Sequence, residues 1–181
     1  MFYDYSMNFD ELIEKRQSVR LYNKEKLVEK EKIEACLYAA HLAPSACNSQ
    51  PWHFTVVQGE KADKLEKYTH GLGMNKFTTS VPVFVVVSEA AYNVTAGIGS
   101  KIKHHDFRSC DIGAAVSYFT LQAQDLGLGT CILGWFDEKP IKKLCGIKGR
   151  IQLVIAVGYP AENYPLRKKI RKNLSEIVDW Q

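Results

Sequence analysis

Several patterns that would place a sequence in a common class are absent from this 181-residue chain. Its five cysteines form no C-x-x-C pair, and a scattered, odd set argues against both a structural zinc site and a disulfide framework. The longest apolar run, residues 81–87, is far shorter than the ~20 residues that a membrane-spanning helix needs. We find no internal repeat and no low-complexity segment. We therefore expect a protein of a reducing, cytoplasmic compartment, with no membrane partner.

Signals for export and for familiar catalytic machinery are also missing. The first residues include Asp4 and Asp10 and show no basic segment followed by an apolar stretch, so we expect no signal peptide. No G-x-S-x-G elbow is present, although counting alone excludes neither Ser/His/Asp nor Cys/His catalysis. Cys47 is expected to be a small packing residue rather than a reactive thiol. The run His104-His-Asp106 is not expected to bind metal, because adjacent side chains do not point to one spot.

The composition is that of an ordinary globular protein, with 46% hydrophobic and 24% charged residues. The length suits a single domain over residues 1–181. The formal charge is only +4, and much of the excess lies in residues 167–172. Such an excess fits a phosphate-bearing small molecule as well as a nucleic acid. Because this basic stretch lacks interleaved aromatic residues for base stacking, we expect no nucleic-acid partner.

Helical and strand patterns alternate along the chain. Helices are predicted over residues 9–16, 30–42, 61–70, 106–126 and 139–144, and strands over residues 52–58, 83–88, 130–135 and 151–159. This interleaving predicts an α+β class with one central sheet, but it does not reveal the strand order. The tail after Pro160 is predicted to be polar and extended, with apolar residues at Leu174, Ile177, Val178 and Trp180. Such a tail would be unstable alone, so we expect it to lie over a partner subunit.

Residues 43–52, A-P-S-A-C-N-S-Q-P-W, are the most informative run of the chain. They connect a predicted helix to a predicted strand, a kind of junction where α/β folds often place ligands. Ser45, Asn48 and Gln50 supply hydroxyl and amide groups that both donate and accept hydrogen bonds. That mixture suits the edge of a flat heterocycle. The alternative, a corner whose polar groups satisfy only their own backbone, stays open.

A second motif, Arg16-Gln-Ser-Val-Arg20, places two guanidinium groups and a hydroxyl at the end of a predicted helix. Arginine forms bidentate, charge-assisted bonds to phosphate, so the motif predicts a phosphate clamp. A solvated surface with ordinary salt bridges is the alternative. The glycines of residues 127–134 follow a helix and precede a strand, which is the reverse of the dinucleotide-binding order. Gly134 instead indicates backbone that closely approaches a ligand.

In this order, the motifs resemble those of the nitroreductase family of FMN-dependent oxidoreductases, over nearly the whole chain. The resemblance rests on Arg16–Arg20, Ala43–Trp52, Asp111 with the helix that follows it into Leu126-Gly-Leu-Gly-Thr130, Gly134, and Val157-Gly-Tyr-Pro-Ala-Glu162 before the basic tail. Gln17 departs from the pattern, because an arginine often stands there. Leu133 departs as well, where longer members often carry an acidic residue. The chain also lacks the long helical insertion of larger members.

The resemblance implies a central, mostly antiparallel sheet flanked by helices, and an intertwined homodimer whose C-terminal tails extend over the partners. It implies that FMN binds at the subunit interface. Residues implied at the phosphate and ribityl chain are Arg16, Ser18, Arg20, Lys169 and Arg171. Residues implied to approach from the other subunit are Pro44, Ser45, Ala46 and Asn48, with Gln50 close by. The backbone of Leu133 and Gly134 is implied near flavin N5, and Asn75 at the pyrimidine edge.

The function implied is hydride transfer from NADH or NADPH to flavin N5, and then to a nitroaromatic, a quinone or another electron-poor ring, with ping-pong kinetics. The cofactor carries this chemistry, so no catalytic side chain and no metal ligand is nominated. One alternative is a flavin-binding module without turnover, acting as a store or sensor. Another is a flavin-dependent dehydrogenase or dehalogenase of the same superfamily.

Overall fold

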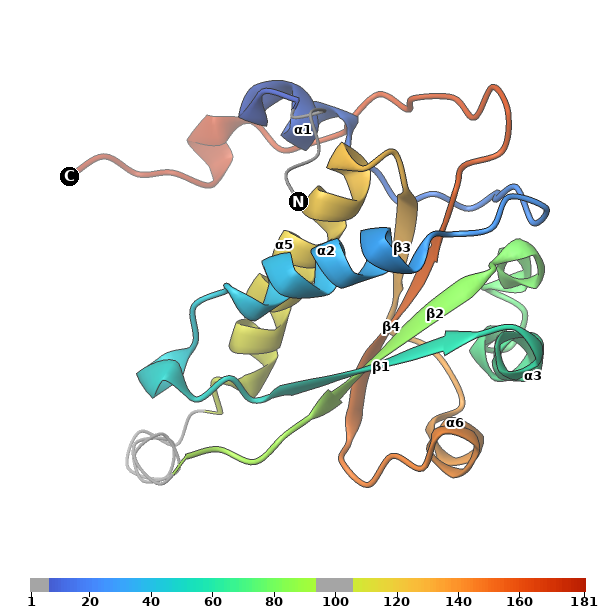
Figure 1. Cartoon of the computed structure of the whole chain (residues 1–181). Helices are drawn as coiled ribbons and strands as arrows, with labels where there is room; N and C mark the ends of the chain where they lie inside the picture. Colours follow the sequence, from blue (N-terminus) through green and yellow to red (C-terminus); the bar gives the residue numbers. More distant parts are fainter. Residues whose placement is uncertain (1–6, 94–105) are drawn as a thin grey trace.

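The computed structural model describes residues 7–93 and 106–181, which build a sheet covered by helices on both faces (Figure 1). The strands are β1 (Trp52–Gln58), β2 (Val83–Glu89), β3 (Gly129–Leu133) and β4 (Ile151–Gly158). They lie in the order β1-β2-β4-β3, and each neighbouring pair is antiparallel. The predicted α+β class with a central antiparallel sheet is confirmed.

Strand β2 is buried on both faces, as its continuous apolar run predicts. Val83, Val85 and Val87 pack in the layer formed with α2 (Lys30–His41) and α5 (Arg108–Asp125). Phe84 and Val86 belong to the opposite layer, with α3 (Glu60–Thr69) and α6 (Glu138–Cys145). Successive side chains of a strand point to opposite faces, so one strand supplies both cores. Burial of each such side chain contributes roughly 1.5–3 kcal/mol.

The ends of several elements differ by one or two residues from the predicted ones. Helix α1 (Phe9–Lys15) is capped by Asn8, whose side chain accepts the N–H of Glu11 at 3.0 Å. Gly127, with φ 75°, follows the end of α5, and Gly129 is already the first residue of β3. Short 3-10 turns cover Ala46–Asn48 (η1), Lys76–Ser80 (η2) and Leu174–Glu176 (η3).

The C-terminal tail leaves β4 and crosses the molecule beside α1, so that the chain end lies beyond that helix (Figure 1). It is not extended throughout, because η3 forms a turn capped by Asn173. The tail exposes six large apolar side chains: Leu166, Ile170, Leu174, Ile177, Val178 and Trp180. Trp180 is 95% exposed. The tail therefore gains little burial from the rest of the chain.

No helix in the described part of the chain is both long and apolar enough to cross a bilayer.

Candidate functional site

The basic segment 16–20 runs beside the first residues of β3. Ser18 forms a parallel bridge with Thr130, and Val19 N donates to Thr130 O at 2.8 Å. Gly129 permits this approach, because a Cβ there would lie only 2.7 Å from Val19 Cγ2. The sheet thus fixes the backbone of the segment.

The tail lies along the same segment, and Gln17 joins the two. Gln17 Nε2 donates to Pro165 O at 3.0 Å, while Gln17 Oε1 accepts the N–H of Arg167 at 3.1 Å. An arginine at this position could not make both bonds, because its side chain has no acceptor. Lys169 Nζ donates to Arg16 O at 2.6 Å. The departure at Gln17 therefore has a structural role, which is to hold the tail against the basic segment.

Between the segment and the tail lies a cavity of about 360 Å³. It is lined by Arg16, Gln17, Ser18, Arg167, Lys168, Lys169, Ile170 and Arg171. Five of these residues are cationic, and within residues 7–93 and 106–181 none of them forms an ion pair with a carboxylate. We call this the basic cavity. It brings together Arg16, Ser18, Lys169 and Arg171 from the predicted clamp.

Arg20 is predicted to belong to the same clamp, but it does not line the basic cavity. Its backbone N–H donates to Tyr164 Oη at 3.0 Å. Its guanidinium lies 6.0 Å from the centre of the Phe77 ring. Arg20 is exposed and lies next to the cavity, with its side chain directed toward Phe77.

The surroundings of Lys169 shift its ionisation. Partial burial, followed by the positive charges of Arg16 and Arg171, lowers the pKa of Lys169 below its usual value. Both causes disfavour the ammonium form. A phosphate monoester carries a charge near −2. Such an anion in the basic cavity would offset the electrostatic penalty on the charged form of Lys169.

The polar corner, residues 44–50, has a strained backbone. Cys47, Asn48 and Gln50 have φ values of 50°, 51° and 47°, in the left-handed region that non-glycine residues rarely adopt. Ser45 stabilises the turn, since its carbonyl accepts Asn48 N at 3.0 Å and its hydroxyl accepts Gln50 N at 2.9 Å. Gln50 Nε2 lies 3.2 Å from Asn48 Oδ1, so the two predicted amides face each other. Such strain persists where surrounding structure enforces it, often at functional sites.

Two residues outside the corner bind its backbone through their side chains. The sequence patterns predicted this contact for neither of them. Asp111 Oδ1, on α5, accepts the N–H of Ala46 at 3.0 Å. Asn93 Nδ2 donates to Cys47 O at 2.9 Å. Neither contact is local in sequence, so no spacing rule could have found it. Pro44, which precedes the turn, is exposed.

The third predicted group lies at the end of β3. Leu133 is buried, whereas Gly134 is exposed, and a Cβ at Gly134 would meet nothing within 4 Å. The space over Gly134 is therefore open to a ligand. Asn75 Nδ2 donates to Trp135 O at 3.0 Å, which brings Asn75 to the same loop. Strand β3 ends at Leu133, two residues before the end of the predicted strand. Trp135 is exposed, and its side chain lies next to Gly71.

Within the chain, the basic cavity and the polar corner lie at opposite ends of the sheet. Thr130, beside the basic segment, pairs with Val157 of β4, which pairs with Val83 at the start of β2. The corner leads into Trp52, which pairs with Glu89 at the other end of β2. The length of β2, seven residues at ~3.3 Å each, separates the two by about 20 Å. Figure 1 shows the corner, at η1 after α2, far from α1 and the tail.

His104 and His105, discounted above as metal ligands, lie outside the described residues. Among the residues that the structure does describe, no group of three or more His, Cys, Asp or Glu side chains could hold a metal ion.

Comparison with known proteins assigns the family. The sequence model of the nitroreductase family matches residues 13–74 and 69–159. The chain belongs to the nitroreductase family. A family relative in Archaeoglobus fulgidus, named as an NADH dehydrogenase/NAD(P)H nitroreductase, is 31% identical over 159 residues, covering 83% of this chain and 84% of the relative. An iodotyrosine deiodinase of Drosophila melanogaster is 22% identical over 195 residues, covering 93% of this chain and 68% of the relative.

Solved structures of nitroreductase family proteins share the fold. A family protein from Streptococcus pneumoniae TIGR4 superposes with a TM-score of 0.80 at 25% identity, covering 96% of this chain and all of that one (100%). An FMN-dependent nitroreductase from Clostridium difficile R20291 has a TM-score of 0.71 at 27% identity, with 93% and 96% of the two chains covered.

Proposed function

We propose that this nitroreductase family protein is an FMN-dependent oxidoreductase that takes electrons from NADH or NADPH and delivers them to a nitroaromatic, a quinone or a similar electron-poor acceptor. The observation that carries the proposal is the basic cavity, where five cations gather without a carboxylate partner in the described chain. A phosphate monoester supplies the missing negative charge. The FMN-dependent relative of known structure supports the same cofactor.

The residues present fit FMN. Arg16, Lys169 and Arg171 are proposed to bind its phosphate by charge-assisted bonds, and Ser18 to bind the adjoining chain. Arg20 is proposed to contribute from beside the cavity. When bound, FMN supplies the hydride chemistry, and the protein supplies position and charge.

The flat ring is proposed to lie against two further groups. The backbone of Leu133 and Gly134 offers an open surface for it, because no side chain covers Gly134. Asn75 is proposed to face the pyrimidine edge through its amide oxygen, since its Nδ2 already donates to Thr69 O and Trp135 O at 3.0 Å each. Donor and acceptor are proposed to use this surface in turn, which gives ping-pong kinetics.

A homodimer is proposed, with Pro44, Ser45, Ala46, Asn48 and Gln50 supplied to each flavin by the partner subunit. One flavin cannot bridge the basic cavity and the corner of the same protomer across the length of β2, about 20 Å. The exposed apolar side chains of the tail support this proposal, because a partner would bury them. Residues 1–181 are proposed to act as one domain, and the five free cysteines support a reducing, cytoplasmic location.

A spectrum of the purified protein, followed by anaerobic additions of NADH and then NADPH, tests the proposal. We expect a flavin spectrum that bleaches with at least one donor. A flavin spectrum that persists with both would favour a binding module without turnover. Protein that stays colourless after incubation with FMN would contradict the proposal.

Reductive dehalogenation is a second candidate, because an iodotyrosine deiodinase is among the relatives. Iodide release from iodotyrosine by the reduced protein, without turnover of nitroaromatics or quinones, would favour it over the first candidate.

A further inference from the structure

Asp111 is a buried carboxylate in the first turn of α5, with 8% of its surface exposed. Its Oδ1 accepts the N–H of Ala46 at 3.0 Å, while its Oδ2 is buried and has no hydrogen-bond partner in the described chain. Burial of a carboxylate oxygen without a partner is costly. The helix N-terminus offsets part of that cost through its dipole. The presence of Asp111 therefore indicates a positional demand that packing alone does not explain.

The group that Asp111 holds is the start of the strained turn. Ala46 is the first residue of η1, and it is followed directly by Cys47 and Asn48 with positive φ. A left-handed non-glycine residue costs roughly 1–2 kcal/mol. Without the bond to Ala46, the turn could relax toward an ordinary conformation. That relaxation would redirect the side chains of Asn48 and Gln50.

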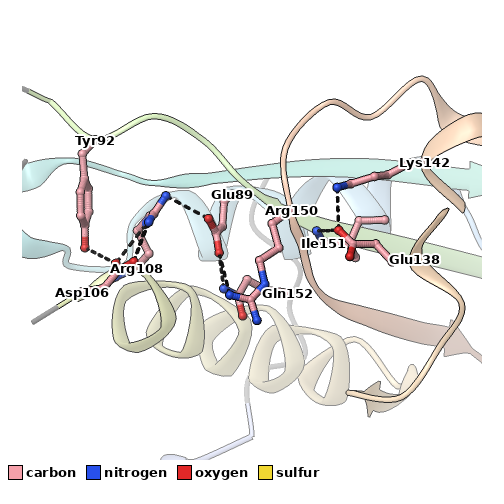
Figure 2. A network of polar contacts seen from close by, with 9 residues as sticks. All are labelled: Glu89, Tyr92, Asp106, Arg108, Glu138, Lys142, Arg150, Ile151 and Gln152. Carbon is pink, nitrogen blue, oxygen red and sulfur yellow. Dashed lines mark hydrogen bonds and ion pairs between the residues drawn. The ribbon is translucent and has the colours of Figure 1, made fainter.

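The helix that carries Asp111 is itself fixed to the sheet by a polar network, drawn in Figure 2. Arg108 Nη1 lies 2.9 Å from Glu89 Oε2 at the end of β2, and Arg108 Nη2 lies 2.6 Å from Asp106 Oδ2. Tyr92 Oη donates to Asp106 Oδ1 at 3.0 Å. Gln152 Nε2 donates to Glu89 Oε1 from the neighbouring strand. The start of α5, and with it Asp111, is therefore held in place relative to β2 and β4.

We propose that Asp111 is a positioning residue for flavin binding: its hydrogen bond to Ala46 N holds the strained corner so that the Asn48 and Gln50 amides face the flavin of the partner subunit. This inference rests on the proposed function. Asp111 acts through Ala46 and does not itself touch the flavin. The requirement is a hydrogen-bond acceptor at Oδ1, and the charge is secondary.

Two substitutions separate the acceptor from the charge. Asp111→Asn keeps an oxygen that can accept from Ala46 N, whereas Asp111→Ala removes it. We expect Asp111→Ala to weaken FMN binding about tenfold and to shift the visible flavin spectrum, and Asp111→Asn to stay within about twofold of the unchanged protein. Thr120→Ala is the control, because Thr120 is buried on the same helix and its hydroxyl donates to Ser117 O at 3.1 Å, its one side-chain bond among the described residues. It should lower thermal stability without changing FMN affinity.

The thiol of Cys47 gives a readout that needs no flavin. Cys47 was expected to be a packing residue, but it is exposed in the strained turn. Burial, by contrast, raises the pKa of the Cys36 thiol to about 12 and also raises the pKa of Cys131. In a background where Cys110 and Cys145 are replaced by serine, a thiol reagent should label Cys47. We expect Asp111→Ala to change its labelling rate several-fold, and Asp111→Asn to leave the rate unchanged.

Unchanged FMN affinity, flavin spectrum and Cys47 labelling in Asp111→Ala would overturn the inference. Equal loss in Asp111→Asn and Asp111→Ala would overturn it too, since it would make the charge the requirement. If the unchanged protein binds no FMN, the proposed function fails, and the Cys47 labelling rates alone decide whether Asp111 holds the corner.

Discussion

The two ends of the sheet offer a ligand opposite kinds of group. The basic cavity presents charged side chains on an ordinary backbone, and burial together with like charges there lowers the pKa of Lys169. The polar corner presents neutral amides on a backbone held in rare conformations at Cys47, Asn48 and Gln50. The first kind supplies affinity through charge, and the second supplies position through geometry. One cofactor with a charged end and a flat, polar ring can use both.

The largest effect is expected from charge removal in the basic cavity. Arg16→Ala should weaken FMN binding by about 1.5–3 kcal/mol, because one charge-assisted contact is lost. The affinity of the variant should also depend less on salt concentration than that of the unchanged protein. Fluorescence titration at two salt concentrations measures both. Lys61→Ala is the control, since Lys61 is exposed on α3. Equal FMN affinity in Arg16→Ala and Lys61→Ala would show that Arg16 is a surface residue that does not bind the phosphate.

The next effect tests whether β3 fixes the basic segment. Gly129→Ala places a Cβ 2.7 Å from Val19 Cγ2, so Val19 must shift. Overpacking of this kind costs about 1–3 kcal/mol of stability, and the displaced segment should bind FMN more weakly. Gly113→Ala is the matched control, because nothing lies within 4 Å of a Cβ there. Thermal melts and FMN titrations measure the difference. A Gly129→Ala protein with unchanged FMN affinity would show that the cavity does not depend on this contact.

A smaller effect is expected at the corner. Asn48→Gly removes the amide but suits the φ of 51°, so stability should be kept. FMN binding should weaken by about 0.5–1.5 kcal/mol, the contribution of a neutral hydrogen bond, with an unchanged dependence on salt. Asn163→Gly is the control, because Asn163 has a φ of 56° in the loop after β4. If the salt dependence of Asn48→Gly falls as in Arg16→Ala, the contrast between the two ends is wrong.

The smallest effect is expected from pH. The pKa of Lys169 is lowered in the free protein, and a bound phosphate favours the charged form. FMN affinity should therefore hold at neutral pH and decline as pH rises through that lowered pKa, which lies below the usual value of 10.5. The change should be about 1 kcal/mol or less. Lys169→Arg stays charged over this range and should show a flatter profile. If FMN affinity depends on pH in the same way in the unchanged protein and in Lys169→Arg, Lys169 does not bind the phosphate.

The sequence predicted the elements well, because their residues carry strong local patterns. The β-branched run of β2 and the glycine after α5 were sufficient to place those elements. The strand order was not predictable, since it depends on contacts between distant segments. The dense polar run at residues 43–52 pointed to the corner, but its positive φ values and its bond to Asp111 leave no local signature. Gln17 was noted only as a departure, and its bonds to the tail explain it.

Mixing of two defective proteins tests the central claim, that each flavin is held by the basic cavity of one protomer and the corner of its partner. An Arg16→Ala protein and an Asn48→Gly/Gln50→Gly protein would be unfolded together, refolded together and titrated at an FMN concentration that leaves each parent nearly empty. In a trans arrangement, each mixed dimer regains one intact site, so random pairing restores about a quarter of all sites. No restoration in verified mixed dimers, or a monomer that binds FMN, would contradict the account.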